Sequence, residues 1–512
     1  MKTNHSKLWP MIALSLMVLI SCQQQAWYEH FEDSGKAGSE KMMMEYIESE
    51  PQLDLFMQML QVSGYDTVLS VSQAYTVWAP KNEALTSVDI NDTATVTEIV
   101  SNHIASYAIS TSTTRSEKVF MFSNKLVSFV GDKFGLSTLT DANIKVANGL
   151  LHIIDAYVPY VPNIWEYAER IPGLDSLAIY FEKQDQRKFN LLESEQIGVN
   201  ADNQPIYDSV FYESNRYLTQ VANLNNENAV YTVLFPTNEA WQKSFNVIKD
   251  YYKTTEDDGG FSKQKSLAQA TLVQDLVFSG NFKEDGYPDS IIISTSGNIF
   301  NNPEDIFQGS TTYDASNGVI YVTDSLRLPA TDSWHTPILI EAENSSYGRT
   351  ALNAKVYSRT SYGTAIQTSG NRYLEVEATG TTILSKTYVD FPIPDVLSAK
   401  YDIYCLFVPE SIVNRINPKE NMVNISMSYV DADGRLKNNV SLLKRVTIDA
   451  NDTTLVHVAQ MDFPYCNVID ENSSISDILV KLRIENAVTS SQTRLYTRTM
   501  RIDCVIFVPI ED

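Results

Sequence analysis

One stretch of this sequence occurs twice. YTVWAPKNEAL at residues 75–85 returns as YTVLFPTNEAW at residues 231–241, with seven of eleven positions identical. Each copy begins with the apolar alternation of a short strand, and a proline then ends strand pairing because it has no N–H to donate. Asn82 and Asn238 follow as candidate helix N-caps, each with a glutamate in the first helical turn. The duplication predicts two modules built on the same strand-to-helix corner.

A second pair of matching stretches lies downstream of the corners. NGLLHIIDAYVP begins at Asn148 and NGVIYVTDSLRLP begins at Asn317. Asn-Gly favours a hairpin turn because both residues tolerate positive φ, and the alternating residues after it predict a closing strand. Ahead of each corner, apolar residues at helical spacing predict a helix; the first covers 53–60 and stops at Gly64, and the second is interrupted at 172–173.

Together these boxes resemble the fasciclin (FAS1) domain, whose first box reads like TVFAPTNEAF and whose last reads like NGVLHVID. The resemblance covers residues 40–330 as two copies, 40–160 and 161–330. It implies two α+β modules of a kind found mainly in adhesion and matrix proteins.

The two copies differ at the histidines of the family. The family's Asn-His pair lies at 102–103, whereas the second copy has Gln274-Asp275 there and Tyr321 in place of the last-box histidine. The resemblance implies that His103 and His152 are structural, hydrogen-bonded at the edge of the core, and have no catalytic or metal-binding role.

The sequence pattern changes after Pro329, where eight short β-branched runs are separated by Gly, Asn and Asp turns. This pattern predicts an all-β, jelly-roll-like sandwich over 331–512. Within it, DADGRLKNN at Asp431 predicts a hairpin turn, because the acidic positions of a calcium loop are missing.

IEAEN near the start of this region and MRIDCVIFVP at its end resemble the first and last strands of galactose-binding-like jelly rolls, including family 6-like carbohydrate-binding modules. The resemblance implies a structural calcium held by Glu341, Glu343 and Asp503, since carboxylate oxygens suit that ion; ordinary surface carboxylates are the alternative. A sugar-binding face normally needs aromatic rings. The candidates are Trp334, Tyr347, Tyr362 and Tyr373.

The N-terminus reads as an export signal rather than as part of a fold. Residues 1–21 combine Lys2 and Lys7 with the apolar run MIALSLMVLI, which is too short for a permanent bilayer span. LISC resembles a bacterial lipobox and implies that Cys22 carries the acyl chains of a lipoprotein, palmitate among them, with 22–39 as a linker. The alternative is an ordinary secretory signal with a chance cysteine. Since no Asp follows Cys22, we expect the outer membrane, lipid-anchored and at the cell surface.

The net charge limits the classes of partner that we expect, and the cysteine content limits the possible disulfides. The chain carries 39 Lys and Arg against 63 Asp and Glu, a net charge of −24, which disfavours nucleic acid. Besides Cys22, only Cys405, Cys466 and Cys504 are present, and the sequence leaves open whether two of them form a disulfide.

Seven Asp-Ser or Asp-Thr pairs precede an aliphatic residue or Thr, and they resemble the acceptor motif of a bacterial periplasmic O-glycosylation system. The turn and cap chemistry of the same pairs is an equal alternative. The acceptors would be Thr67, Thr93, Ser176, Ser209, Ser290, Ser325 and Thr453.

The sequence contains no HExxH, GxSxG, GxGxxG or P-loop pattern. We therefore expect a non-enzymatic envelope lipoprotein for adhesion or binding, without a cofactor apart from the calcium. Its layout resembles accessory subunits of nutrient-uptake complexes that pair an outer-membrane TonB-dependent transporter with a lid lipoprotein and take up glycan or peptide. A secreted glycan-acting enzyme and a purely structural envelope protein are the alternatives.

Overall fold

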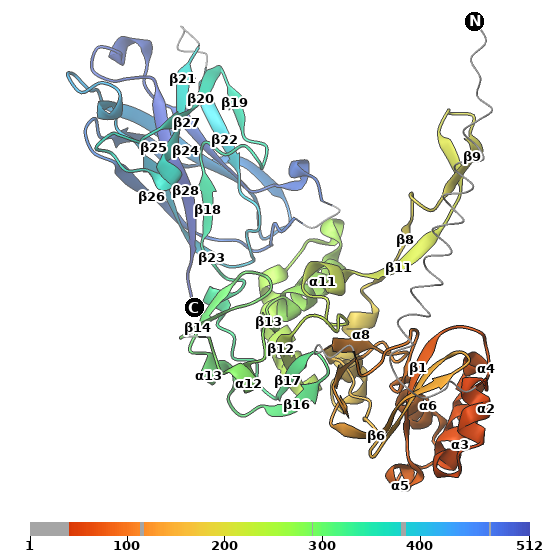
Figure 1. Ribbon diagram of the computed structural model, residues 1–512. Helices are drawn as coiled ribbons and strands as arrows, with labels where there is room; N and C mark the ends of the chain where they lie inside the picture. The colour runs from red at the N-terminus through yellow and green to blue at the C-terminus, as the bar shows by residue number, and fades with distance from the viewer. Residues whose placement is uncertain (1–39, 113–116, 289, 380–385, 470–472, 512) are drawn as a thin grey trace, which may run out of the picture. The chain divides into compact units, whose positions relative to one another are not determined.

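The computed structural model describes residues 40–112, 117–288, 290–379, 386–469 and 473–511 (Figure 1). Contacts divide the chain into two compact units. The first unit runs to residue 163 and includes the loops 225–229 and 315–317; the second comprises the remaining residues. Among the described residues, no helix combines the length and the apolar character that crossing a membrane requires.

The first unit is an α+β module around a seven-stranded sheet of order β2-β1-β7-β6-β5-β4-β3. Its helices are α2 (Met43–Glu48), η1 (Pro51–Leu53), α3 (Asp54–Ser63), α4 (Tyr65–Leu69), α5 (Asn82–Leu85), α6 (Thr93–Ser101). Its strands are β1 (Tyr75–Pro80), β2 (Ile104–Ala105), β3 (Glu117–Phe120), β4 (Leu126–Val130), β5 (Lys133–Phe134), β6 (Ser137–Val146), β7 (Gly149–Ile154). Helices α2, α3, α4 and α6 lie together beside the sheet in Figure 1. The predicted helix is α3, which buries Phe56 and Leu60 and ends at Gly64 with φ +75°.

Strand β1 is buried at every position, so the predicted alternation is wrong. It pairs in parallel with β7, from Tyr75 opposite Gly149 to Pro80 opposite Ile154. Parallel strands covered on both faces carry continuous apolar runs. The approach is tightest at Gly149, where φ is +145° and an added Cβ would lie 1.9 Å from the carbonyl oxygen of Tyr75.

The Asn-Gly box also differs from the prediction. The loop between β6 and β7 is Ala147-Asn148, because Val146 already pairs with Gly149, and Asn148 does not adopt positive φ. Its buried side chain accepts from the Met43 N–H at 2.7 Å and donates to the Leu69 carbonyl at 2.8 Å. The box thus supplies side-chain hydrogen bonds from Asn and a close backbone approach at Gly.

The corner asparagines are a further correction, because neither caps its own helix. The Asn82 side chain accepts from the Leu55 N–H at 2.9 Å and donates to the Pro51 carbonyl at 2.8 Å. It therefore caps α3, a helix that precedes it in sequence. Asn238 does the same in the second copy, where it accepts from the Ser176 N–H at 2.8 Å.

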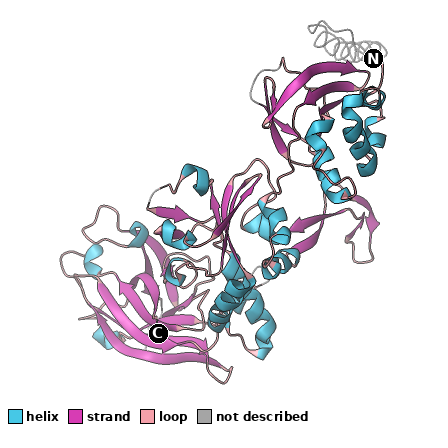
Figure 2. Cartoon of the chain, turned by 90° about the horizontal axis from the view of Figure 1, so that it is seen from below, coloured by secondary structure: helices cyan, strands magenta, loops and turns pink. Residues whose placement is uncertain are grey.

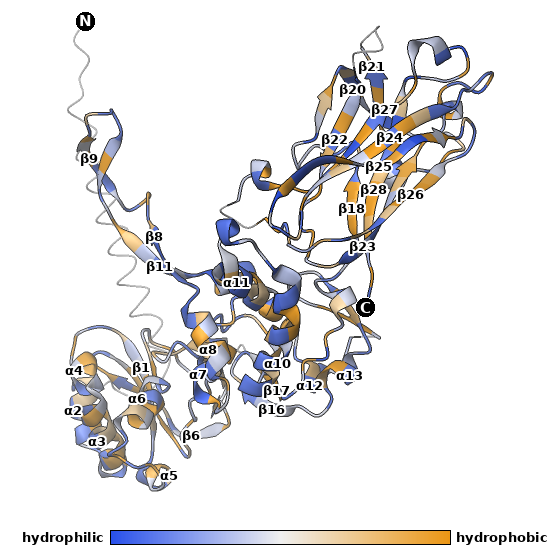
Figure 3. Ribbon diagram, turned by 180° about the vertical axis from the view of Figure 1, so that it is seen from behind, coloured by the Kyte–Doolittle hydropathy of each residue, from blue (hydrophilic) through white to orange (hydrophobic). Residues whose placement is uncertain are grey.

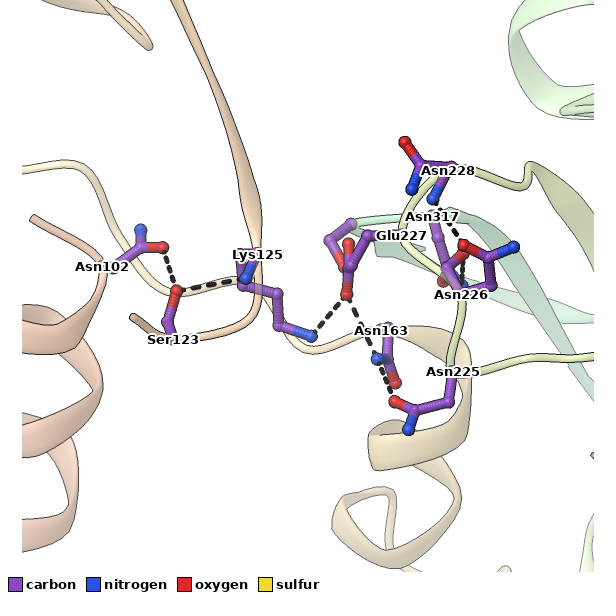
Figure 4. A network of polar contacts seen from close by, with 10 residues as sticks. Asn102, Ser123, Lys125, Asn163, Asn225, Asn226, Glu227, Asn228 and Asn317 are labelled. Carbon is purple, nitrogen blue, oxygen red and sulfur yellow. Dashed lines mark hydrogen bonds and ion pairs between the residues drawn. The ribbon is translucent and has the colours of Figure 1, made fainter. Parts of the chain in front are cut away.

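A buried ion pair ties the loop 225–229 into the first unit (Figure 4). Lys125 donates to Glu227 at 2.7 Å, with side chains only 4% and 5% exposed. Asn163 donates to the same Glu227 oxygen at 3.1 Å and to Asn225 at 2.9 Å. This pair could not be predicted from the sequence, since its two charges lie 102 positions apart.

The second unit begins with the repeated module, whose sheet has the order β13-β12-β17-β16. Its helices are α7 (Ile164–Arg170), α8 (Asp175–Glu182), α9 (Arg216–Gln220), α10 (Asn238–Ile248), η2 (Lys249–Tyr252), η3 (Glu256–Asp258), α11 (Gly260–Val273), α12 (Phe282–Asp285), α13 (Pro303–Phe307), η4 (Ala330–Asp332). Its strands are β12 (Tyr231–Pro236), β13 (Val277–Ser279), β14 (Ile291–Ile293), β15 (Ile299–Asn301), β16 (Thr311–Ala315), β17 (Gly318–Thr323). The interruption predicted at 172–173 separates α7 from α8.

This module repeats the geometry of the first. Strand β12 runs parallel to β17, and an added Cβ at Gly318 would lie 1.9 Å from the carbonyl oxygen of Tyr231. It departs from the first copy in a β-hairpin arm over residues 185–215, which Figures 1 and 3 show extending away from α8. The arm contains β8 (Asp185–Phe189), β9 (Glu195–Val199), β10 (Pro205–Asp208), β11 (Phe211–Asn215).

The C-terminal region is a two-sheet sandwich, as predicted, and Figure 2 shows its strands joined by loops. The eight predicted runs are all strands, and β19, β20 and β22 are strands that the pattern missed. The bounds are β18 (Ile338–Glu341), β19 (Thr350–Leu352), β20 (Ala354–Thr360), β21 (Arg372–Ala378), β22 (Tyr388–Pro392), β23 (Lys400–Phe407), β24 (Asn421–Val430), β25 (Leu436–Ile448), β26 (Thr454–Asp462), β27 (Lys481–Asn486), β28 (Met500–Pro509). Short 3₁₀ turns are η5 (Ser369–Asn371), η6 (Glu410–Ile412), η7 (Ile475–Asp477), η8 (Ser490–Gln492).

The sheets have the orders β20-β21-β28-β23-β26, with β18 on β28, and β19-β22-β27-β24-β25. Strand β23 alternates between buried and half-buried residues, which places one face in the core. The loop at Asp431 is the predicted hairpin turn: Asp431 accepts from the Arg435 N–H at 2.9 Å, and Gly434 has φ +75°.

Candidate functional site

The two histidines of the first module are occupied by backbone hydrogen bonds. His103 contacts the Ile99 carbonyl at 2.7 Å and accepts from the Val158 N–H at 2.9 Å. His152 contacts the Ile109 carbonyl at 3.0 Å. Burial lowers the pKa of each imidazole to about 4, so both are neutral at pH 7. Neither ring nitrogen is available to a substrate.

Strand register corrects the match between the modules by one residue. The His103 carbonyl accepts from the N–H of Trp78, and the Leu276 carbonyl accepts from Leu234, the residue that corresponds to Trp78. Leu276 therefore takes the place of His103, and Asp275 takes the place of Asn102. The second module has replaced a neutral amide with a buried carboxylate.

The Asp275 carboxylate lies among neutral hydrogen-bond donors. Ser294 donates to it at 2.6 Å, and the Asn298 amide donates at 2.9 and 3.1 Å. The Gln274 amide donates at 3.1 Å, and the Ser333 hydroxyl also donates. Within the described part of the chain, no lysine or arginine forms an ion pair with Asp275. We call Gln274, Asn298 and Ser333 with Asp275 the polar cluster.

Two cavities adjoin the polar cluster. The smaller has a volume of about 280 Å³ and is lined mainly by apolar residues, with Asp275 in its wall. The larger, here called the groove, has a volume of about 890 Å³ and is lined by Gln274 and Asn298. Thr271, Ser333 and Trp334 belong to both walls.

Trp334, the first aromatic candidate, therefore lies in the repeated module beside the polar cluster. Its indole is half-buried, meets the Tyr251 ring edge-on at 4.8 Å and stacks on His335 at 5.7 Å. The sequence did not reveal Gln274, Asn298 and Ser333 as its neighbours. The one signal in the sequence was an acidic residue, Asp275, in a duplicated motif, but its counterpart in the first module could be identified only from the strand register.

The lining of the groove is rich in amides and carries positive charge. Its cations are Lys183, Arg216 and Lys265, whereas Asp395 is its only carboxylate among the described residues. Burial raises the pKa of Asp395. Its side-chain amides are Gln184, Gln186, Gln220, Gln269, Gln274 and Asn298.

The predicted calcium residues lie close enough to influence one another. Burial, together with the charges of Glu341 and Glu343, raises the pKa of Asp503 to about 6. One oxygen each of Glu341 and Glu343 is buried without a hydrogen-bond partner, while Ser369 donates to the other Glu341 oxygen and, through its N–H, to Asp503. Among the described residues, however, no group of three His, Cys, Asp or Glu side chains is arranged to hold a metal ion. The orphaned oxygens fit a cation; the arrangement as it stands does not complete a site.

The three tyrosine candidates are not brought together as one platform. Tyr373 is only 1% exposed and packs in a core cluster with Val408 and Ile412, so its ring is not available to a ligand and that prediction is wrong. Tyr362 is 84% exposed and Tyr347 is 37% exposed.

The cysteines divide into three in the sandwich and Cys22, for which lipidation is predicted. Cys405, Cys466 and Cys504 are all buried free thiols, and burial raises the pKa of each, to about 11 for Cys466. Cys22 lies outside the described residues.

The candidate O-glycosylation acceptors are accessible, but their motifs also perform local roles. Ser176 is half-buried, and the exposed acceptors are Thr67, Thr93, Ser209, Ser290, Ser325 and Thr453. Asp92, directly before Thr93, accepts from the Thr95 N–H and caps α6. Both interpretations of these motifs therefore remain predictions.

Comparison with known protein families bears on the first module. Residues 51–158 match the fasciclin domain family, which confirms the resemblance for the first module. A FAS1 domain pair from the insect cell adhesion molecule fasciclin I shares 17% identity, covers 55% of this chain and 98% of its own, and has a TM-score of 0.21. A search of the curated proteins found no match.

Two further solved structures are each similar to about a third of the chain. The xylan-binding domain CBM22-1 from Paenibacillus barcinonensis shares 12% identity over 34% of this chain and 95% of its own, with a TM-score of 0.22. A xanthan lyase from Paenibacillus shares 11% identity over 38% of this chain but only 16% of its own, with a TM-score of 0.24.

Proposed function

We propose that this protein is a non-enzymatic lipoprotein of the outer membrane, anchored at the cell surface through acylated Cys22, that serves adhesion or ligand binding. The two FAS1 modules act as a scaffold, and the sandwich and the surfaces beside it engage glycan or peptide. The protein acts in complex with a TonB-dependent transporter and its lid lipoprotein.

The observation that best supports this role is how the duplicated motif residues are used. Asn82 and Asn238 cap helices, Gly149 and Gly318 admit a neighbouring strand, and His103 is neutral and bonded to the backbone on both ring nitrogens. The residues that define the modules serve the fold, so function falls to the surfaces that differ between the copies.

A calcium ion held by Glu341, Glu343 and Asp503 belongs to this proposal. It would neutralise carboxylates that are buried together, and two of their oxygens have no hydrogen-bond donor. The ion would act on stability rather than on chemistry, because binding only the folded state stabilises that state.

The proposal is tested by fractionating cells that produce the Cys22→Ala variant. Without its acyl chains, each methylene of which contributes about 0.8 kcal/mol to membrane binding, the protein should leave the membrane fraction. Cys466→Ala, which removes a thiol within the sandwich, is the matched control and should stay. If Cys22→Ala sediments with outer membranes as the wild type does, lipid anchoring is wrong.

The transporter partnership needs a separate experiment. Extraction of wild-type membranes in mild detergent, followed by purification of this chain, should bring down a TonB-dependent transporter in a fixed ratio. Recovery of the chain alone at every detergent concentration would argue against the complex while leaving the anchor intact.

A further inference from the structure

We propose that the groove beside Trp334 binds an acidic oligosaccharide, a glycan that carries uronic acid units. The inference rests on the binding role proposed above and names a ligand class for a groove that residues of the second FAS1 module and of the sandwich line together. Three features carry it: oriented amide oxygens, an aromatic face and a locally positive lining.

The polar cluster fixes the direction in which its amides face. The side-chain nitrogens of Gln274 and Asn298 both donate to Asp275, which can only accept. Because the nitrogen of each amide donates to Asp275, the oxygen of that amide lies on the side away from Asp275. Within the described chain, no donor reaches the side-chain oxygen of Gln274 or Asn298. Two acceptors are thus held in place for the hydroxyl groups of a ligand.

Asp275 is therefore a positioning residue and not a ligand contact, because it is itself only 1% exposed. Its counterpart in the first module shows the contrast. Asn102 uses its own amide nitrogen to donate to the carbonyls of Val158 and Pro159. A carboxylate cannot donate in this way, and Asp275 instead accepts hydrogen bonds from the side chains around it.

Trp334 supplies the apolar surface. Its indole lines both cavities, next to Ser333 of the polar cluster. Aromatic faces beside hydrogen-bonding groups suit a sugar ring, which presents C–H groups on one face and hydroxyls at its edge. The groove volume of about 890 Å³ lies in the upper part of the range of small-molecule sites and exceeds what one sugar unit needs.

The charge of the lining selects an anion. The chain as a whole has a net charge of −24, yet the described lining of the groove contains three cations, Lys183, Arg216 and Lys265, and one carboxylate, Asp395. The side chains of Lys183 and Lys265 form no hydrogen bond or ion pair with any described residue. Electrostatic complementarity then favours carboxylates on the ligand. The two amide oxygens accept hydrogen bonds from hydroxyl groups, so they favour a uronic acid glycan over an acidic peptide.

The test is isothermal titration of the full chain, purified in mild detergent, with oligogalacturonate. Two matched probes are the carboxyl-reduced neutral oligosaccharide of the same length and an oligoglutamate peptide. We expect oligogalacturonate to bind, the neutral sugar to bind more weakly, and the difference to shrink as salt screens the lysines. Equal binding of acidic and neutral sugar, tighter binding of oligoglutamate, or no binding of oligogalacturonate would overturn the proposal.

Variants then place the site. Trp334→Ala should weaken oligogalacturonate binding about tenfold or more, as for an aromatic anchor, and Lys183→Gln with Lys265→Gln should reduce it to the level of the neutral sugar. Asp275→Asn should weaken both sugars, and Gln274→Ala, at a half-buried position, should do the same if Asp275→Asn unfolds the module. Tyr362→Ala on the sandwich is the control and should change nothing.

An affinity unaffected by Trp334→Ala and by Gln274→Ala would place the ligand elsewhere and refute the groove. That outcome leaves the lipid anchor standing, because the Cys22→Ala fractionation reads membrane attachment and not sugar binding. Conversely, failure of the anchor experiment leaves the titration of the groove unaffected.

Discussion

Asn82→Ala should destabilise the first unit by way of helix α3 and not through the helix that contains Asn82. The substitution removes an acceptor from the Leu55 N–H and a donor from the Pro51 carbonyl. A lost helix cap costs about 1 kcal/mol, and the loss of the exposed hydrogen bond to the Pro51 carbonyl costs about 0.5 kcal/mol more. The first unit should therefore lose about 1.5 kcal/mol, which corresponds to a fall in Tm of roughly 4–8 °C.

Hydrogen exchange distinguishes the two helices. In Asn82→Ala the amide of Leu55 should lose protection, whereas the amides of the short helix α5 should change little, since Lys81 precedes it without any side-chain cap. Loss of protection at Ala84 together with an unchanged Leu55 would show that Asn82 supports its own helix. An unchanged melting curve would refute the reasoning altogether.

The second copy supplies a matched pair for the same experiment. Asn82→Asp keeps the acceptor for a helix N-terminus, where negative charge is favourable, and loses only the donor to Pro51. Asn238→Asp instead brings a carboxylate within 2.7 Å of Asp175, to which the Asn238 amide now donates. The Asn→Asp change should therefore be milder in the first module than in the second; the reverse order would contradict the assigned bonds.

The remaining predictions concern buried ionisable groups. Glu227→Gln should destabilise the first unit by about 3–5 kcal/mol in denaturant unfolding because the buried ammonium of Lys125 loses its ion pair with Glu227. Combining it with Lys125→Met should recover most of the loss, and additive losses would contradict this. Acidification from pH 6.5 to 4 should destabilise the first unit, on the order of 3 kcal/mol per histidine, because His103 and His152 take up protons only when unfolded. The raised pKa of Asp503 acts in the opposite direction, so the stability that Asp503 contributes to the second unit should weaken as the pH rises from 4 to 6. Asp503→Asn should abolish this pH dependence, measured by amide exchange of β28. Chelation of calcium should lower the Tm of the second unit in the wild type and leave Asp503→Asn unchanged, whereas identical melting of the wild type with calcium and with chelator would remove the metal from the proposal.

Much of the architecture was readable from the sequence because it depends on local pattern. The duplicated box, the helix that stops at Gly64 and the eight strand runs of the sandwich all carry their signal within a few residues. Two of the strands that escaped notice have few or no buried residues: β19 is exposed at all three positions, and β20 is exposed or half-buried throughout. The arm over 185–215 escaped for a related reason, because an extended hairpin without a core has no buried face to impose a pattern on its sequence.

The candidate site was far less predictable. Trp334 was singled out, but its neighbours Gln274 and Asn298 are common polar residues that acquire meaning only through Asp275. The sequence match placed Asp275 one position away from its structural counterpart, and only strand register separates these alternatives. Tyr373 failed for a different reason: β21 is buried at four consecutive positions, 373–376, so both of its faces are covered there, which alternation in the sequence does not predict.

The tight start of β7 also has a consequence for the chemical ageing of the protein. An Asn-Gly bond deamidates when the glycine nitrogen attacks the asparagine side chain, which requires that side chain to be free to turn. Asn148 is held by the Met43 N–H and by the carbonyls of Leu69 and Val71, and Gly149 is pressed against β1. The folded module thus protects Asn148 from a deamidation that is fast in an unfolded chain. Isoaspartate at Asn148 would accumulate only in molecules whose β1–β7 junction has opened, and its slow appearance would record how often that happens.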